Sequence, residues 1–344
     1  LIRAMDIVIT SADSAPFPVE SHGMGTRSLA ALLVFRSYVN VVRPRKDADR
    51  LLSVAGFEEP EAHLHPQAQR AAFDILSEIG GQRIVSTHSP QVVSIAAIDA
   101  YRVFRRQGAE TVVSAITPDK AASWDAEQVR RFVQLRNPDV LFAKAVGIVE
   151  GDTEAAAFAV FARKWWGARG ADGRGVSLVH TGGAGSSKHV VPFLDALGVP
   201  WVILCDADPE GKKGLAALGK ALDRVLDGSS PEVVALPDGQ AIEEYLLAQG
   251  YLDHACAAID RHPDGPLSSY MEQMQGQRRK GGTTRDYSGL DGRQLACLDF
   301  LRSSKGTIGV LLAEEVVRET GEPSVVHWPP AVQEFFHRLD EVCG

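Results

Sequence analysis

The sequence predicts an α/β protein whose second half is built on a parallel β-sheet. Its 344 residues are enough for two or perhaps three domains, and 45% hydrophobic with 23% charged residues is ordinary for a globular chain. Three short apolar runs in the second half alternate with segments of helical pattern, and each run ends in a glycine-rich or acidic turn. Strands that alternate with helices in this way form one parallel sheet.

The composition excludes several classes of protein. The net charge of −8 argues against bulk attraction to nucleic acid, although a local basic surface can still occur. No apolar run reaches membrane-spanning length, and there is no signal peptide. No two cysteines form a CxxC pair, which argues against a zinc site and for a reducing cytoplasm. The four are Cys205, Cys256, Cys297 and Cys343. The chain begins at Leu1, so we expect it to be a piece of a longer protein.

The first half contains two strand-like runs that each end in polar residues. In "LLSVAGFEEPEAHLHPQAQRAAFDIL" an apolar strand ends in Glu58-Glu59-Pro60, and apolar residues then recur at helical spacing. In "RIVSTHSPQVV" a second short strand runs into Ser86-Thr87-His88. An isolated histidine in this position is more often a hydrogen-bonded core residue, but the two motifs occur together.

This pair of motifs resembles the second part of an ATP-binding-cassette (ABC) ATPase. The resemblance implies that Glu58 holds Mg²⁺ through water, that Glu59 polarises the attacking water, and that His88 senses the γ-phosphate. The family usually has aspartate where this chain has Glu58. "ESHGMGTRSLAALL" resembles the signature loop of the family, in which backbone N–H groups and a helix N-terminus face phosphate. Its residues here are Ser21, Gly23 and Gly25.

The phosphate-binding loop of such an ATPase is missing from the sequence. G-x-x-x-x-G-K-[ST] occurs nowhere, and the nearest glycine-rich stretch, "HTGGAGSSKH", has the wrong spacing. We therefore expect ATP to be a cofactor of the full-length protein only. A turn-like Asn-Pro in "VQLRNPDVLFAK" predicts a boundary near residue 138, with a partial ATPase lobe in 1–138 and a second domain in 139–344.

Acidic residues follow two of the strands predicted in the second half. Ala145 to Val149 form a strand that ends in Glu150-Gly151, and a helix then runs from Thr153 to Trp166. The strand Trp201 to Cys205 ends in two aspartates one residue apart, which point the same way. Ligands of parallel sheets bind beyond the carboxyl ends of the strands. The acids there are Glu150, Asp206 and Asp208, with Glu154 one helical turn further on. Loop acids, a helix N-cap and a favourable helix dipole are the alternative explanations.

The motifs "IVEGDTE" and "LCDAD" resemble those of the Toprim domain, and an ABC ATPase followed directly by Toprim resembles the OLD (overcoming lysogenization defect) nucleases. The resemblance implies a Rossmann-like parallel sheet with a helical insertion at about 245–304. It also implies a second glutamate in the first motif, met by Glu154, and a later acid in "LPDGQAIEEYLLAQG". Glu243 aligns better with that acid than Glu244. A late lysine is matched by Lys305 in "LRSSKGTIGVLLAEEV".

Carboxylates are the side chains that phosphodiester hydrolysis requires. Two Mg²⁺ or Mn²⁺ ions about 4 Å apart activate a water and relieve charge on the leaving oxygen. Such hard cations take oxygen ligands, so no histidine or cysteine is needed. The predicted metal ligands are Glu150, Glu154, Asp206, Asp208 and Glu243. Glu150, Asp206 and Asp208 are also predicted to be catalytic, with Lys305 as the cation beside the scissile phosphate.

Two basic segments are candidates for contact with the DNA backbone. Lys212 and Lys213 follow the aspartate pair, and "QRRKGG" is predicted to be a mobile loop in the helical insertion that carries Arg278, Arg279 and Lys280. Contacts of this kind hold a duplex without reading its sequence.

The function that these motifs predict is a metal-dependent DNA endonuclease or nickase, coupled in the full-length protein to an ATPase. We expect DNA as partner, a homo-oligomer formed through the ATPase domain, and a helicase as a further candidate partner. A Toprim topoisomerase or primase is one alternative, and Tyr245, Tyr251, Tyr270 and Tyr287 are the tyrosines available to it. A recombination or repair mediator with purely structural acids is another. The biological target, whether phage, damage or a recombination intermediate, stays open, as does the choice between Glu243 and Glu244.

Overall fold

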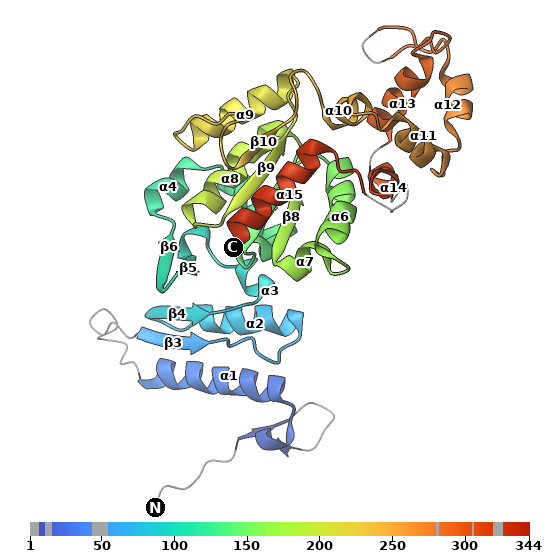
Figure 1. Cartoon of the computed structure of the whole chain (residues 1–344). Coiled ribbons are helices and arrows are strands. Elements are labelled where there is room, and N and C mark those ends of the chain that lie inside the picture. The colour runs from blue at the N-terminus through green and yellow to red at the C-terminus, as the bar shows by residue number, and fades with distance from the viewer. Residues whose placement is uncertain (1–6, 11–15, 43–53, 280–281, 305, 319–325) are drawn as a thin grey trace, which may run out of the picture. The chain divides into compact units, whose positions relative to one another are not determined.

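The chain forms two compact units, Leu1–Ala97 and Ile98–Gly344, each with its own hydrophobic core (Figure 1). The computed structural model describes residues 7–10, 16–42, 54–279, 282–304, 306–318 and 326–344. None of the described helices combines the length and the apolarity that crossing a membrane requires.

A parallel pair of strands forms the centre of the first unit. Strand β3 (Val54–Glu58) lies beside β4 (Gln82–Ser86), and helix α2 (Pro66–Ser77) connects them. Helix α1 (Met24–Val42) packs against α2 around a small core. Both strands and the helix between them are confirmed where the sequence predicts them. The remaining elements are β1 (Val8–Ile9), β2 (Phe17–Pro18), the 3₁₀ turn Val19–Ser21 and α3 (Pro90–Val93).

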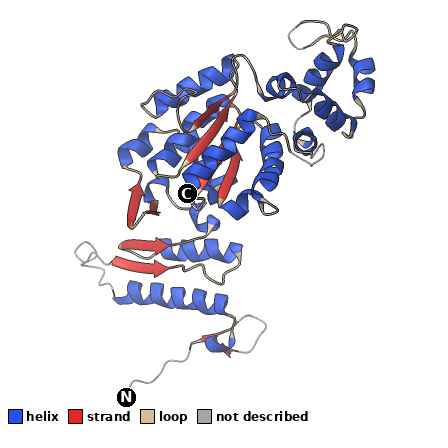
Figure 2. Cartoon of the chain, in the orientation of Figure 1, coloured by secondary structure: helices blue, strands red, loops and turns tan. Residues whose placement is uncertain are grey.

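The second unit is built on a four-stranded sheet in the order β10-β9-β7-β8, with every pair parallel (Figure 2). The predicted parallel sheet is confirmed. All residues of β7 and of β9 are buried, as expected for strands covered on both faces. The strands are β7 (Ala145–Val149), β8 (Val176–His180), β9 (Trp201–Cys205) and β10 (Val233–Ala235).

Helices follow the strands and cover both faces of this sheet (Figures 1 and 2). The last helix, α15, lies over β7, where a Cβ at Gly147 would stand only 3.0 Å from the ring of Phe335. Phe335 in turn packs edge-on against Phe158 of α6 at 5.0 Å between ring centroids. The covering helices are α6 (Asp152–Trp166), α7 (Gly170–Arg174), α8 (Ser187–Ala196), α9 (Pro209–Ala221) and α15 (Pro330–Cys343).

The segment predicted as a helical insertion is helical. It shares one core with α6 and α15, so it belongs to the same unit as the sheet. The glycine at position 309 allows α14 to cross α6 closely, because a Cβ there would lie 2.2 Å from the carbonyl oxygen of Thr153. The helices are α10 (Ile242–Ala248), α11 (Leu252–Asp260), α12 (Leu267–Met274), α13 (Gly292–Ser303) and α14 (Thr307–Val316).

An antiparallel hairpin and several short helices precede the sheet, and the sequence analysis made no prediction for the hairpin. Its turn contains Gly108 at a φ of +61°, a left-handed conformation that favours glycine. Contacts group this segment with the sheet, while the domain boundary near residue 138 stays a prediction. The elements are η2 (Ile98–Ala100), β5 (Arg102–Gln107), β6 (Glu110–Ala115), α4 (Pro118–Ser123), α5 (Ala126–Val129), the π-helix Arg130–Arg136 and the 3₁₀ helix Pro138–Leu141.

Candidate functional site

The strand order reverses at the carboxyl edge of the sheet, and the acids that meet there are called the acidic crevice below. The chain passes from β7 outward to β8, crosses back, and adds β9 on the other side of β7. Crevices of open α/β sheets lie at such reversals of strand order. Glu150 directly follows β7 and Asp206 directly follows β9, so the topology brings their two strand ends side by side.

The Glu150 carboxylate reaches across to the end of β9. Its Oε1 accepts a hydrogen bond from the backbone N–H of Asp206 at 3.2 Å. The pKa of Glu150 is raised to about 7, chiefly by burial; the hydrogen bond from Asp206 opposes this, and the charges of Glu154, Asp208 and Glu210 support it. A proton is therefore held near neutral pH in the metal-free site.

Asp206 experiences the same accumulation of negative charge. Burial, followed by the charges of Glu150, Glu154, Glu243 and Asp208, raises its pKa to about 8. The electrostatic neighbours of this one carboxyl group are thus the other four acids that the sequence analysis selected as metal ligands.

Two glycines allow the acids of this edge to approach one another. A Cβ at Gly151 would lie 2.8 Å from Oε2 of Glu154, so the Glu154 carboxylate folds back over the turn that follows Glu150. A Cβ at Gly211 would lie 2.1 Å from the carbonyl oxygen of Asp206, so the chain can turn sharply after β9 only with glycine there.

Asp208 is the N-cap of α9, which agrees with the N-cap explanation that the sequence analysis gave as an alternative to a metal ligand. Its Oδ1 accepts a hydrogen bond from the N–H of Gly211 at 2.7 Å. The cap orients the carboxylate at the same edge as Asp206, and capping is compatible with a second role for the group.

The two glutamates of α10 have different surroundings. The loop before α10 lies along the aspartate motif, because Ala207 donates its N–H to the carbonyl of Gln240 at 2.9 Å. Glu243 acts electrostatically on Asp206, whereas Glu244 forms an ion pair with Arg302 of α13. This difference favours Glu243 as the acid of the site.

The donor set suits a hard divalent cation. The described groups whose charges raise the pKa values of Glu150 and Asp206 are all carboxylates, and burial is the larger cause of both shifts. A hard cation would offset both the burial cost and the repulsion. Within the described ranges, no three His, Cys, Asp or Glu side chains already stand in a ligating arrangement. The carboxylates therefore need side-chain rotations to ligate an ion together.

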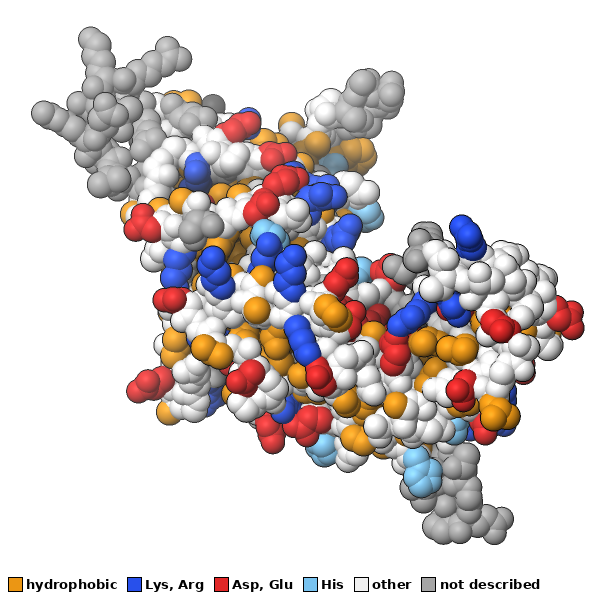
Figure 3. Space-filling view, turned by 90° about the horizontal axis from the view of Figure 1, so that it is seen from above, with side chains coloured by type: hydrophobic (Ala, Val, Ile, Leu, Met, Phe, Trp, Pro, Cys, Tyr) orange, Lys and Arg blue, Asp and Glu red, His pale blue; other side chains and the backbone are white. Residues whose placement is uncertain are grey.

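The predicted basic residues differ in their exposure and in the ion pairs that they form. Lys212 forms an ion pair with Asp238, and Lys213 is exposed. Arg279 pairs with the largely buried Asp299, with its Nη2 at 2.7 Å from Oδ2, whereas Arg278 is exposed. Lys280 and Lys305 lie outside the described residues. Figure 3 shows acidic and basic side chains mixed on the face seen from above.

Sequence analysis missed three neighbours of the site. Glu210 adds its charge to Glu150, and its place in "DADPEG" was the available signal. His180 ends β8 with its Nε2 3.3 Å from Oδ1 of Asp152. The pairing of Arg302 with Glu244 had no sequence signal, since the two residues lie 58 positions apart and only the folded helices bring them together.

The candidate ATPase residues of the first unit lie at the ends of β3 and β4. Glu59 has a φ of +41°, an uncommon conformation for a residue other than glycine, and its Oε1 lies 3.3 Å from Nε2 of His88. Glu58 is the last residue of β3. Nearby, the buried Glu61 accepts hydrogen bonds from the hydroxyl of Thr87 and the N–H of His88. The two sequence-predicted residues Glu59 and His88 therefore meet.

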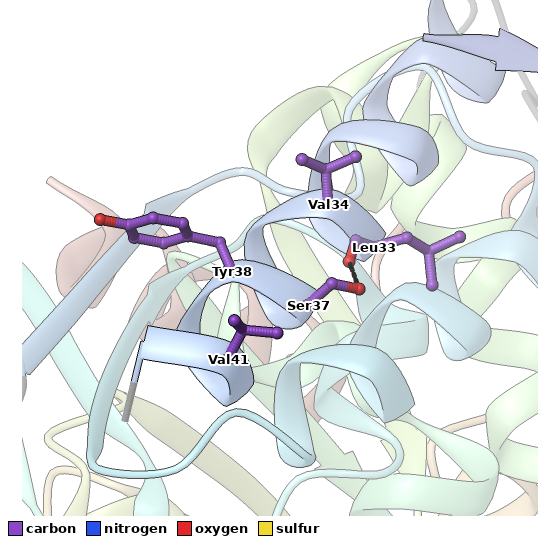
Figure 4. Close-up of a pocket in the computed structure, with 5 residues that line it drawn as sticks. All are labelled: Leu33, Val34, Ser37, Tyr38 and Val41. Atoms are coloured by element: carbon purple, nitrogen blue, oxygen red, sulfur yellow. Dashed lines mark hydrogen bonds between the residues drawn. The ribbon is translucent and has the colours of Figure 1, made fainter. Parts of the chain in front are cut away.

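The signature-like loop leads into α1. Ser21 ends a 3₁₀ turn, Gly23 precedes the helix, and Gly25 lies in its first turn. A Cβ at Gly25 would stand 2.7 Å from the carbonyl oxygen of His63, so glycine is required for this contact. Further along α1, a shallow groove is lined by Leu33, Val34, Ser37, Tyr38 and Val41 (Figure 4). None of the described residues that line the groove is a carboxylate.

Two protein families match separate parts of the chain. Residues 141–208 match the TOPRIM domain of overcoming lysogenization defect protein-like proteins, and residues 4–93 match an AAA ATPase domain. The resemblance and the fold class predicted from the sequence are thereby confirmed. Glu150, Glu154, Asp206 and Asp208 fall within the first match, whereas Glu243 lies beyond it.

Curated relatives match over part of their length. The chain is 30% identical to the OLD nuclease of Thermus scotoductus over 202 residues. This match covers 56% of this chain and 36% of that protein. The chain is 27% identical over 220 residues to the uncharacterized protein YbjD of Escherichia coli, covering 63% and 39%. The chain thus spans less than two fifths of either relative.

Solved structures to which part of the chain is similar include the C-terminal region of the Burkholderia pseudomallei OLD protein. It is 20% identical, covers 58% of this chain and 99% of that one, and superposes with a TM-score of 0.39. The C-terminal region of the Xanthomonas campestris OLD protein is 19% identical, covers 60% and 96%, and has a TM-score of 0.38.

Proposed function

We propose that this chain carries a metal-dependent DNA endonuclease site at the carboxyl edge of its parallel sheet. The observation that supports it most strongly is the half-buried pair Glu150 and Asp206. The two groups meet at the reversal of strand order, and burial with neighbouring acids raises both pKa values, to about 7 and about 8. A fold does not keep so many acids together for stability, since their mutual repulsion destabilises the metal-free state.

The carboxylates have distinct proposed roles in hydrolysis. Two Mg²⁺ or Mn²⁺ ions held here would supply an activated water and relieve charge on the leaving oxygen. Asp206 would be a ligand of both ions, because the charges of the other four acids all act on it. Glu150 and Glu154 would bind from the end of β7 and the start of α6, and Asp208 and Glu243 from the starts of α9 and α10. Lys305 is proposed to neutralise charge on the attacked phosphate.

Contacts with DNA are proposed for the predicted basic residues. Arg278 and Lys213 are exposed and form no ion pair with the described residues, whereas Lys212 and Arg279 would have to exchange partners. Such contacts hold a duplex without reading bases. Since the chain spans less than two fifths of its curated relatives, ATP use, homo-oligomerisation and a helicase partner are proposals for the whole protein.

The topoisomerase alternative has no support among the tyrosines. Tyr245, Tyr251 and Tyr287 are each less than one tenth exposed, and Tyr270 packs edge-on against Phe300. Tyr251 donates its hydroxyl hydrogen to the carbonyl of His327, and the Tyr245 hydroxyl accepts from the N–H of Ala331. A nucleophilic tyrosine must reach a phosphate, and the burial of Tyr245, Tyr251, Tyr287 and the Tyr270 hydroxyl prevents this.

Incubation of supercoiled plasmid with the purified chain in Mg²⁺ or Mn²⁺ tests the proposal. Nicked or linear DNA, abolished by a chelator, would support the nuclease. Relaxed topoisomers would support the topoisomerase instead. Intact plasmid in both metals would leave the mediator, in which the acids have a structural role.

A further inference from the structure

The first turn of α10 carries two adjacent glutamates that face different neighbours. Consecutive residues of a helix point about 100° apart, so Glu243 and Glu244 cannot both enter the acidic crevice. Glu243 contributes to the field at Asp206. Glu244 faces the helical insertion, where the Arg302 guanidinium pairs with its Oε1.

Arg302 connects the end of α13 to the start of α10. Figure 1 shows α10 between the sheet and the helices α11 to α13, and α10 packs directly against α13. The Glu244 side chain is 22% exposed and that of Arg302 56% exposed. Oε2 of Glu244 is buried, so the pair fixes a glutamate that is otherwise largely shielded from water. An exchange of Glu244 for Glu243 at the crevice would require α10 to rotate and this pair to break.

We propose that Arg302 is a positioning residue that decides which of the two adjacent glutamates serves the metal site. The buried face of α10 already sets its rotation about its axis. The pair acts on the first turn, where it holds Glu244 against α13 and so keeps the adjacent Glu243 directed toward Asp206. The inference rests on the proposed metal-dependent function and adds to it a residue from the helical insertion, some sixty positions after the acid that it positions.

The sign of the expected effect separates positioning from simple electrostatics. Removal of a positive charge from the neighbourhood of clustered acids makes the field more negative, which by itself strengthens the binding of a divalent cation. Loss of positioning weakens binding instead, because Glu243 no longer points consistently at the ion. Residues that orient metal ligands typically contribute 10- to 100-fold in affinity, which exceeds the field of one partly exposed, solvent-screened charge.

Calorimetric titration of the full chain with Mn²⁺ alone tests this assignment. We expect Arg302→Gln to bind Mn²⁺ about tenfold more weakly than the wild type. The charge-swapped double variant Arg302→Glu with Glu244→Arg should recover most of the affinity, because it restores the pair. Arg293→Gln is the matched control, since Arg293 also lies on α13 but pairs with Asp253 of α11, away from the glutamates of α10. It should bind as the wild type does.

Affinity for a DNA duplex, measured in Ca²⁺, shows whether Arg302 instead holds a phosphate. We expect it to be unchanged in Arg302→Gln, with cleavage restored toward the wild-type kcat at high Mn²⁺. Weakened DNA binding that the charge swap fails to restore would assign Arg302 to the substrate and overturn the inference.

Two outcomes of the Mn²⁺ titration would also overturn it. Equal or tighter Mn²⁺ binding by Arg302→Gln contradicts positioning but leaves the nuclease proposal intact. Absence of Mn²⁺ binding by the wild type removes the proposed function and this inference together. Should Arg302→Gln fail to fold, Glu244→Gln breaks the same pair with a smaller change and must weaken Mn²⁺ binding as well.

Discussion

The acids that follow β7 and β9 have a different environment from those that follow β3. Glu150 and Asp206 lie at the edge of a sheet covered on both faces, and burial raises their pKa values to about 7 and about 8. Glu59 and His88 lie at the edge of a two-stranded pair, with side chains 49% and 83% exposed. Both regions place polar residues at the carboxyl ends of parallel strands.

The difference shows that strand-end position alone does not create a charged site. A covered sheet removes water from the acids, so each charge strongly affects the next, whereas exposed side chains are screened by solvent. The carboxyl edge of the four-stranded sheet can therefore concentrate negative charge for cations without any further partner. At the ends of β3 and β4, Glu59 and His88 are in contact, but they have little of the burial that makes electrostatic interactions strong.

Removal of the central acid should give the largest effect. We expect Asp206→Ala to reduce plasmid cleavage in Mg²⁺ to background, because Asp206 is the proposed ligand of both ions. Thermal unfolding of the metal-free variant should occur at the same or a higher temperature, since one member of a repelling cluster is gone. Glu59→Gln is the matched change in the other region and should cleave normally. Cleavage by Asp206→Ala at the wild-type rate would exclude the two-metal assignment.

The proposed catalytic cation should give the next largest effect. Lys305→Ala is expected to lower kcat by one to three orders of magnitude, about 1.4 to 4 kcal/mol of transition-state stabilisation, with DNA affinity nearly unchanged. Steady-state kinetics at saturating DNA measures this. A variant that loses DNA affinity but keeps kcat would mean that Lys305 only holds DNA.

The basic loop provides the contrasting variant. Replacing Arg278, Arg279 and Lys280 with alanine should weaken DNA binding and leave kcat close to wild type. Because Arg279 already pairs with Asp299, we expect the salt dependence of binding to fall by about two phosphate contacts, with three as the upper limit. Titrations at several salt concentrations give the slope.

The raised pKa values also predict how pH changes stability without metal. The pKa of Asp206 rises from 3.8 to about 8 and that of Glu150 from 4.5 to about 7, so the folded state holds protons that the unfolded chain releases. Stability from these groups is therefore greatest below about pH 4 and falls as pH rises toward about 8. Asparagine mimics the protonated acid, so the gain in Tm of Asp206→Asn over the wild type should grow across this range and then level off.

Mg²⁺ should reverse this dependence in the wild type. The ion binds the deprotonated carboxylates, so it should raise the Tm of the wild type more at pH 8 than at pH 5, and should hardly affect Asp206→Asn. A difference in Tm between the two proteins that does not change with pH would contradict the burial of Asp206.

The close crossing of α14 on α6 should give a smaller effect. Alanine at position 309 would place its Cβ 2.2 Å from a backbone oxygen of Thr153, which no side-chain rotation relieves. Overpacking costs about 1 to 3 kcal/mol, and the better helix propensity of alanine offsets up to about 1 kcal/mol. We expect Gly309→Ala to lose about 1 to 2 kcal/mol in denaturant unfolding. Gly289→Ala, which meets no atom within 4 Å, is the control, and equal stability of the two variants would exclude the close contact.

Local sequence pattern predicted the strands and the acids that follow them. The runs Ala145–Val149 and Trp201–Cys205 are apolar throughout because both faces of those strands are covered, and parallel pairing then brings their ends together. The acids could therefore be predicted, because they lie next to these apolar runs in the sequence.

Contacts between distant helices could not be predicted in this way. The pairing of Glu244 with Arg302 and the approach of Gly309 to Thr153 depend on how helices of the insertion pack, which no periodicity encodes. The hairpin of β5 and β6 was missed for another reason. Its glycine turn at Gly108 was visible, but the flanking residues are mostly exposed and carry a weak pattern.

The smallest expected effect concerns ATP, and it tests whether the two regions differ as sharply in activity as in environment. The chain contains no G-x-x-x-x-G-K-[ST] loop to bind phosphates, although Glu59 and His88 are in contact. We expect no ATP turnover above background and no change in the rate of plasmid cleavage when ATP is added. Phosphate release and cleavage assays, with and without ATP, measure both. ATP turnover that disappears in Glu59→Gln would show that the exposed acid and histidine suffice for catalysis without the lysine and backbone amides of a phosphate-binding loop. The difference in burial between the two regions would then not extend to their activity.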